Sequence, residues 1–178
     1  VLYSGNMGNK QGLSIIADAA QAAAQDYPLL KFIVCGDGPA KGPMQKATEG
    51  LDNITFLPLQ PFSQFNDLLN SADIHLLPQK LAAADLVLPS KLTGMLASGR
   101  PTLACAEVGT ALYEEMTGRG VCVEPENSVQ FSEALISLAQ SKDLRVKLGK
   151  AARERALAYW DKPAVMETIE EELLDLCR

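Results

Sequence analysis

The chain alternates between two patterns of apolar residues. Short apolar runs bounded by glycine, proline or aspartate are typical of buried strands, whereas apolar positions repeated every three or four residues are typical of helices. Strands are expected at residues 1–5, 30–35, 53–57, 73–77, 102–105 and 120–123. Helices are expected at residues 12–25, 41–49, 62–71, 90–99, 110–117, 128–140, 144–159 and 162–176.

This order of elements predicts an α/β fold. About six strands separated by helices form a doubly wound, Rossmann-like parallel sheet with helices on both faces. Ligands of such folds bind beyond the carboxyl ends of the strands. That rule selects the loops at residues 5–12, 36–39, 78–90 and 106–110, three of which are rich in glycine and allow a close backbone approach to a ligand.

Size and charge narrow the class of protein. The chain has 178 residues, which suits one domain, and its net charge of −6 argues against a nucleic-acid partner. It contains no apolar run of about 18 residues, so the sequence predicts no membrane span. The chain starts inside an expected strand and without Met. We expect it to be part of a longer protein, with a trimmed complete domain as the alternative.

The segment 88–104 holds the strongest candidate site. Pro89 and Ser90 are typical of a helix start, Leu92 begins an apolar helix face, and Gly99 is typical of a helix end. A helix N-terminus attracts anions, and Lys91 adds a mobile positive charge there. The alternative is the ordinary helix, glycine and strand unit of any α/β protein.

The loop after the first strand is a second candidate. Gly5 and Gly8 allow backbone N–H groups to approach a phosphate, and Asn6, Asn9 and Lys10 are able to donate hydrogen bonds. The glycine spacing matches neither the dinucleotide fingerprint nor a P-loop. A plain tight turn is the alternative.

Other candidate residues have simpler interpretations. Asp37 and Ser63 are candidate helix caps, and His75, the only histidine, is interpreted as a core residue of a strand. Asp85 and Glu107 lie in carboxyl-end loops, where each accepts hydrogen bonds from sugar hydroxyls or is simply a solvated charge. No zinc site is favoured, because a second histidine and paired cysteines are absent. Cysteines within strands suit a reduced, cytosolic compartment.

Five segments occur in one order along the chain: residues 3–13, 33–39, 71–78, 89–101 and 121–125. Together they resemble the C-terminal, nucleotide-sugar-binding half of a retaining GT-B glycosyltransferase of family 4 (group 1). The bacterial exopolysaccharide enzymes, including the colanic acid biosynthesis glycosyltransferases, are the most similar members. The resemblance covers nearly the whole chain. Tyr159, Trp160 and the last helix look like the family's closing segment, which packs toward the N-terminal domain.

The resemblance implies that residues 1–178 hold a nucleoside diphosphate sugar, which is the donor substrate. The sugar passes with retention to a glycan or lipid-linked acceptor, whose site lies in an N-terminal domain outside this chain. No metal or cofactor is expected, no catalytic residue is assigned, and the isolated domain is expected to be inactive. The location implied is cytoplasmic, with the inner face of the membrane as an alternative. The expected donor-binding residues are Gly5, Asn6, Gly8, Lys10, Pro89, Ser90, Lys91, Leu92, Gly94, Glu107, Gly109 and Thr110.

The sequence departs from the family pattern at charged positions. Asn6 and Gln11 occupy the places of an arginine and a lysine that grip the diphosphate, and Gly94 occupies the place of the second of two glutamates. The first glutamate would fall near Leu86. We therefore expect Lys10 and Lys91 to supply the positive charge, with backbone N–H groups at residues 5–8 and 109–110.

Two other classes of protein remain open at this stage. One is a non-catalytic α/β module that binds a nucleotide or a partner, and the missing charged residues keep it in consideration. The other is half of a nicotinamide dehydrogenase, which the missing fingerprint disfavours. Ligand-induced thermal stabilisation separates them, because nucleoside diphosphates stabilise a transferase half and dinucleotides a dehydrogenase half.

Overall fold

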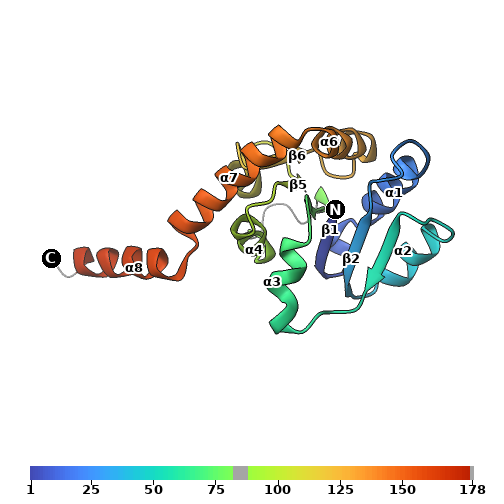
Figure 1. Ribbon diagram of the computed structural model, residues 1–178. Helices are drawn as coiled ribbons and strands as arrows, with labels where there is room; N and C mark the ends of the chain where they lie inside the picture. Colours follow the sequence, from blue (N-terminus) through green and yellow to red (C-terminus); the bar gives the residue numbers. More distant parts are fainter. Residues whose placement is uncertain (82–87, 177–178) are drawn as a thin grey trace.

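A computed structural model provides the fold, and it describes residues 1–81 and 88–176 (Figure 1). The candidate Asp85 and the neighbouring Leu86 lie outside the described residues. Among the described residues, no helix has the length and apolar character needed to cross a membrane.

The described strands form one six-stranded parallel sheet, which confirms the predicted fold class. The strand order is β3-β2-β1-β4-β5-β6, so the direction of winding reverses between β1 and β4. The strands are β1 (Leu2–Asn6), β2 (Phe32–Asp37), β3 (Ile54–Leu57), β4 (His75–Leu77), β5 (Thr102–Cys105) and β6 (Gly120–Val123). The apolar runs of the sequence therefore identified each of these strands to within about two residues.

The helices also lie where the apolar periodicity predicted them. They are α1 (Ser14–Asp26), α2 (Lys41–Ala47), α3 (Phe62–Asn70), α4 (Lys91–Ala97), α5 (Ala111–Met116), α6 (Ser128–Gln140), α7 (Lys142–Tyr159) and α8 (Lys162–Leu176). A short 3-10 turn, η1 (Asn9–Gln11), precedes α1. Gly12 is left-handed with a φ of 59°, so α1 begins at Ser14 and not at Gly12.

Two predicted helix caps are wrong. The Asp37 carboxylate accepts a hydrogen bond from the N–H of Gly38 at 2.9 Å, but α2 starts only at Lys41, so the aspartate closes a turn before the helix. Ser63 lies inside α3, which starts at Phe62 after Pro61. A glycine follows Asp37, and a proline lies two residues before Ser63. In both cases the helix begins at a residue other than the one after the expected cap.

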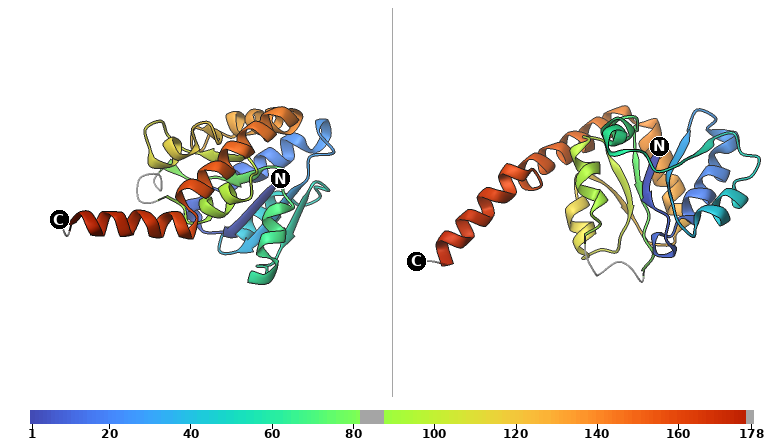
Figure 2. Two further views of the ribbon diagram at one scale, coloured as in Figure 1. Left: turned by 60° about the vertical axis from the view of Figure 1, so that its left-hand side comes forward. Right: turned by 90° about the horizontal axis from the view of Figure 1, so that it is seen from below.

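Helices cover both faces of the sheet (Figure 2). On one face, α1 and α6 pack together over side chains such as Tyr3 and Val34. On the other face, α4 and α5 cover Leu77 and Ala104, while α3 covers Leu2. Successive strand residues therefore point to opposite helical layers, as the pleat of a strand requires.

The last helix differs from the others in its packing. α8 extends away from the sheet, and none of its described residues is buried (Figure 1). Its exposed apolar side chains are Val165, Met166, Ile169, Leu173, Leu174 and Leu176.

Candidate functional site

The candidate site lies at the carboxyl ends of β1 and β4. These neighbouring strands pair at the single register position Leu2–His75, whereas β1 and β2 pair at five positions. β1 therefore continues to Asn6 without further pairing on its β4 side. In doubly wound sheets the crevice beside such a reversal of strand order is where ligands bind.

The first loop is held in place by the loop after β2. Met7 is buried, its N–H donates to the carbonyl of Asp37 at 2.8 Å, and its carbonyl accepts from the N–H of Ala40 at 2.9 Å. A Cβ on Gly38 would lie 2.7 Å from the carbonyl carbon and oxygen of Met7. Gly36 and Gly38 thus permit contact with the first loop, and an approach of this loop to a ligand stays a prediction.

Lys91 projects from the first residue of α4 toward β1. Its Nζ lies 3.3 Å from the hydroxyl oxygen of Tyr3 and 4.3 Å from the centroid of that ring. A Cβ placed on Gly5 would be 3.8 Å from the same Nζ. Burial lowers the pKa of Lys91 to about 8. The expectation of a mobile surface lysine is therefore wrong, because the ammonium is half-buried and held beside the end of β1.

The start of α4 differs in detail from the expected cap. Ser90 occupies the N-cap position, but its side chain forms no capping hydrogen bond. Its carbonyl accepts from the hydroxyl of Thr93 at 3.0 Å, and the N–H of Leu92 donates to the carbonyl of Pro89 at 2.8 Å. Pro89 and Ser90 remain beside Lys91 through these local turns.

Two expected donor-binding positions on α4 point elsewhere. The side chain of Leu92 is buried in the apolar cluster beneath α4 and α5. A Cβ on Gly94 would lie 3.3 Å from Leu69 and 3.9 Å from Phe65, both on α3. A side chain at position 94 would therefore meet α3 first.

Lys10 and Asn6 lie at the outer side of the first loop, and both are exposed. The carbonyl of Lys10 accepts from the N–H of Lys80, at 3.1 Å. A Cβ on Gly8 would lie 2.7 Å from the amide oxygen Oε1 of Gln11, which is the end of a flexible side chain. The sequence did not single out Lys80, although it follows β4 at the predicted edge.

Glu107, Gly109 and Thr110 lie together at the ends of β5 and β6. They line a pocket of about 870 Å³. Thr110 accepts from the N–H of Tyr113 at 3.3 Å and donates to the carbonyl of Glu107 at 2.8 Å, which fixes the loop against α5. The sequence missed Glu124 and Gln130 in this pocket. The only clue to them in the sequence is that Glu124 directly follows β6. In the structure, the N–H of Glu124 donates to the side-chain oxygen of Gln130 at 3.3 Å.

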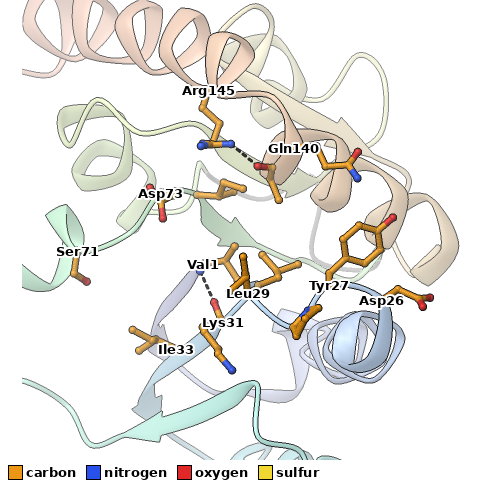
Figure 3. A pocket seen from close by; sticks show the side chains of 14 residues that line it. Val1, Asp26, Tyr27, Leu29, Lys31, Ile33, Ser71, Asp73, Gln140 and Arg145 are labelled. Carbon is orange, nitrogen blue, oxygen red and sulfur yellow. Dashed lines mark hydrogen bonds between the residues drawn. The ribbon is translucent and has the colours of Figure 1, made fainter.

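A second pocket, of about 580 Å³, lies at the amino ends of the strands (Figure 3). Pockets are thus present at both the amino and the carboxyl ends of the strands. Arg145 lines this one, but its guanidinium donates to the carbonyls of Leu138 and Ala139 at 2.8 and 2.6 Å. The guanidinium of Arg145 therefore caps the last carbonyls of α6 and is not available to a ligand. The carboxyl ends of the strands remain the better candidate site.

Other titratable side chains in the sheet are unsuited to catalysis. His75 is fully buried, with Nε2 3.0 Å from the hydroxyl of Ser98, and burial lowers its pKa to about 4. The interpretation of His75 as a core residue is confirmed. Burial raises the pKa of the free thiols Cys105 and Cys122 to about 11 and about 12, so both stay protonated near neutral pH.

Comparisons with known proteins show the family and the fold of the chain. The sequence model of the family described as "Glycosyl transferases group 1" matches residues 1–155. The chain is 42% identical over 171 residues to the colanic acid biosynthesis glycosyl transferase WcaI of Escherichia coli (strain K12), covering 93% of this chain and 40% of that protein. It therefore spans about two fifths of the length of that relative.

Solved structures share the fold. TarM of S. aureus, crystallised with Fondaparinux, alpha-GlcNAc-glycerol and UDP, superposes with a TM-score of 0.80 at 17% identity, covering 98% of this chain and 34% of TarM. The C-terminal domain of the glycosyl transferase group 1 family protein LpcC from Francisella tularensis superposes with a TM-score of 0.75 at 18% identity. That match covers 90% of this chain and 85% of the LpcC domain.

Proposed function

The chain belongs to the glycosyl transferases group 1 family, and from this premise we propose that it binds the nucleoside diphosphate sugar from which the enzyme transfers its sugar. The acceptor is a growing exopolysaccharide or a lipid-linked glycan, in keeping with the name of the colanic acid relative. Residues 1–178 form the donor-binding C-terminal domain, and an N-terminal domain binds the acceptor.

One observation carries the proposal. The ammonium of Lys91 is held beside Gly5 at the point where the strand order reverses. Among the described residues, no carboxylate lies within 4.0 Å of it to form an ion pair. A half-buried cation without a counter-ion, in the crevice where this fold binds ligands, suits a diphosphate.

In the proposed reaction the protein mainly orients the donor and stabilises the charge that develops on the diphosphate. The bond between the anomeric carbon and the diphosphate oxygen breaks, and the acceptor hydroxyl oxygen forms a new bond to that carbon on the same face of the sugar. The hydroxyl proton passes to the departing diphosphate or to solvent. Negative charge then grows on the departing diphosphate. Lys91 stabilises this charge, with Lys10 at the loop's outer side.

The sugar would extend toward the pocket at the ends of β5 and β6. Glu107 lines that pocket and offers carboxylate oxygens to sugar hydroxyls, and Thr110 holds the loop in place. No base is assigned within this chain. The isolated chain is therefore expected to bind donor without transferring its sugar, and the reaction needs the acceptor domain.

Calorimetric titration with UDP and GDP tests the proposal. Wild-type chain should bind at least one of them, and Lys91→Ala should weaken binding by about ten- to a hundredfold, since a charge-assisted hydrogen bond contributes roughly 1.5–3 kcal/mol. Lys31→Ala is the matched control, because Lys31 lies at the amino ends of the strands, away from the candidate site. Equal affinities for wild type and Lys91→Ala would remove Lys91 from the site.

Sugar transfer by a longer protein that carries this domain, and not the titration, separates the alternative function. Asn6 and Gly94 stand where the resemblance implies charged side chains, and their presence suits a nucleotide-binding module without catalysis. Such a module would bind UDP or GDP in the same titration. A longer protein that carries this domain would then transfer no sugar, whereas the transferase would release nucleoside diphosphate in the presence of acceptor.

A further inference from the structure

Tyr3 connects two parts of the proposed donor site. Its side chain is 0% exposed, and its hydroxyl donates to the carbonyl of Asn6 at 2.5 Å. The same hydroxyl oxygen accepts a hydrogen bond from the ammonium of Lys91 at 3.3 Å. Two segments 88 positions apart in the sequence thus meet on one phenol group.

The ring of Tyr3 contributes to the same contact. Nζ of Lys91 lies 4.3 Å from the ring centroid, within the distance at which a cation is attracted to an aromatic face. The ammonium therefore touches the ring and the hydroxyl, and both contacts come from one rigid, buried side chain. A lysine has four rotatable bonds, so without such contacts its charge would sample many positions.

We propose that Tyr3 is a positioning residue for donor binding: its hydroxyl and ring hold the ammonium of Lys91 over Gly5, where it meets the diphosphate of the nucleotide. This inference deepens the proposed function and rests on it. Tyr3 itself is buried beneath the first loop and acts through Lys91. The hydrogen bond to Asn6 keeps the loop backbone and the ammonium in register with each other.

The Tyr3→Phe variant tests the hydroxyl alone, because the aromatic ring remains. UDP and inorganic pyrophosphate are the probes, and pyrophosphate isolates the charged part of the nucleotide. We expect Tyr3→Phe to bind both about three- to tenfold more weakly than wild type, as for loss of one hydrogen bond. Tyr27→Phe at the amino edge of the sheet is the matched control and should bind as wild type does. Circular dichroism verifies that each variant is folded.

A double-mutant cycle decides whether Tyr3 acts through Lys91. In the Lys91→Ala background, Tyr3→Phe should cause no further loss of pyrophosphate affinity, since the group that it positions is gone. An equal loss in both backgrounds would overturn the inference. The titration of ¹³C-labelled Lys91 followed by NMR supplies a readout without ligand. Loss of the hydroxyl should lower the pKa of Lys91, because the charged form loses an acceptor.

The outcomes separate the two proposals. If wild type binds neither UDP, GDP nor pyrophosphate, the proposed function is rejected, and the ligand of this inference with it. If wild type binds but Tyr3→Phe matches it, or the NMR titration of Lys91 is the same in both proteins, only the role of Tyr3 is rejected.

Discussion

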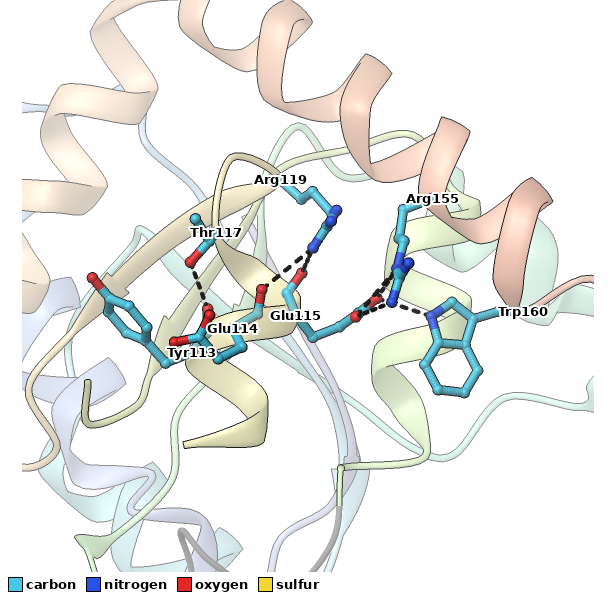
Figure 4. Close-up of polar contacts among 7 residues, drawn as sticks. All are labelled: Tyr113, Glu114, Glu115, Thr117, Arg119, Arg155 and Trp160. Atoms are coloured by element: carbon cyan, nitrogen blue, oxygen red, sulfur yellow. Dashed lines mark hydrogen bonds and ion pairs between the residues drawn. The ribbon is translucent and has the colours of Figure 1, made fainter. Parts of the chain in front are cut away.

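The guanidinium of Arg155 donates two hydrogen bonds from one edge, through Nε and Nη2, to the carboxylate of Glu115 (Figure 4). Nε and Nη2 lie 2.9 Å from Oε1 and Oε2, and the indole N–H of Trp160 donates to Oε1 at 2.9 Å. Glu115 is only 7% exposed. Burial alone would raise the pKa of Glu115, but the hydrogen bonds from Arg155 and Trp160 outweigh it and hold the pKa below its usual range. This contact fixes the end of α7 against α5.

Replacing Glu115 by Gln should therefore destabilise the fold. We expect a loss of about 2 kcal/mol at pH 7, since hydrogen bonds to charged groups contribute roughly 1.5–3 kcal/mol. The lowered pKa gives stability that is present above the unfolded-state value, about 4.3, and is lost as the pH falls through the folded-state value. The difference between wild type and Glu115→Gln in urea unfolding should thus shrink in acid. Glu154→Gln, on an exposed position of α7, should change stability by less than about 0.5 kcal/mol.

Lys91 should reduce stability while it supports binding. Its pKa of about 8 lies below the unfolded-state value of about 10.4, so the folded chain disfavours the charged form. Stability is reduced below pH 8 and recovers as the pH rises from about 8 to about 10.4. Lys91→Met should raise the melting temperature at pH 7, and this gain should vanish near pH 10.5. Lys46→Met, at an exposed position of α2, should show no such gain, and an unchanged melting temperature for Lys91→Met would contradict the assignment.

His75 predicts an acid-sensitive fold. The hydroxyl of Ser98 donates to the carbonyl of Met95 at 2.6 Å, so Nε2 of His75 must be the donor to Ser98. Because its pKa of about 4 lies below the usual 6.5, stability is present above pH 6.5 and is lost as the pH falls toward 4. The loss is on the order of 3 kcal/mol. His75→Asn should be less stable at pH 7 and should lack this part of the pH dependence, as measured by urea unfolding at several pH values.

The contact between the two glycine-containing loops can be tested with alanine. Gly38 has a φ of 146°, and its Cβ would meet the backbone of Met7 at 2.7 Å, so Gly38→Ala should destabilise the fold by more than about 1 kcal/mol. Gly42 lies in α2 with nothing within 4 Å of its Cβ. Gly42→Ala should therefore be neutral or stabilise by up to about 1 kcal/mol. If Gly38 holds the first loop in place, thermal unfolding should shift to lower temperature for Gly38→Ala and not for Gly42→Ala.

The sequence by itself determined the layers of the fold and the edge of the sheet that holds the candidate site. Apolar runs and three- to four-residue periods depend on local geometry, so β5 and β6 were placed without error and α6 and α8 kept their predicted bounds. Chain position alone also placed Lys91 and Glu107 at carboxyl ends of strands. Local polar residues predicted helix starts less well, since Asp37 and Ser63 resemble caps but α2 and α3 begin elsewhere.

Only the tertiary structure decided which groups meet. The strand order places β1 beside β4, and this brings Lys91 to Tyr3, 88 positions away. The packing of the helices brings Glu115 to Arg155 and places position 94 against α3. A sequence pattern shows that a residue is apolar, charged or small, but not its neighbours across the sheet, because those depend on how the layers pack. For that reason the sequence predicted a mobile charge at Lys91, whereas in the fold the ammonium is half-buried and lies over the ring of Tyr3.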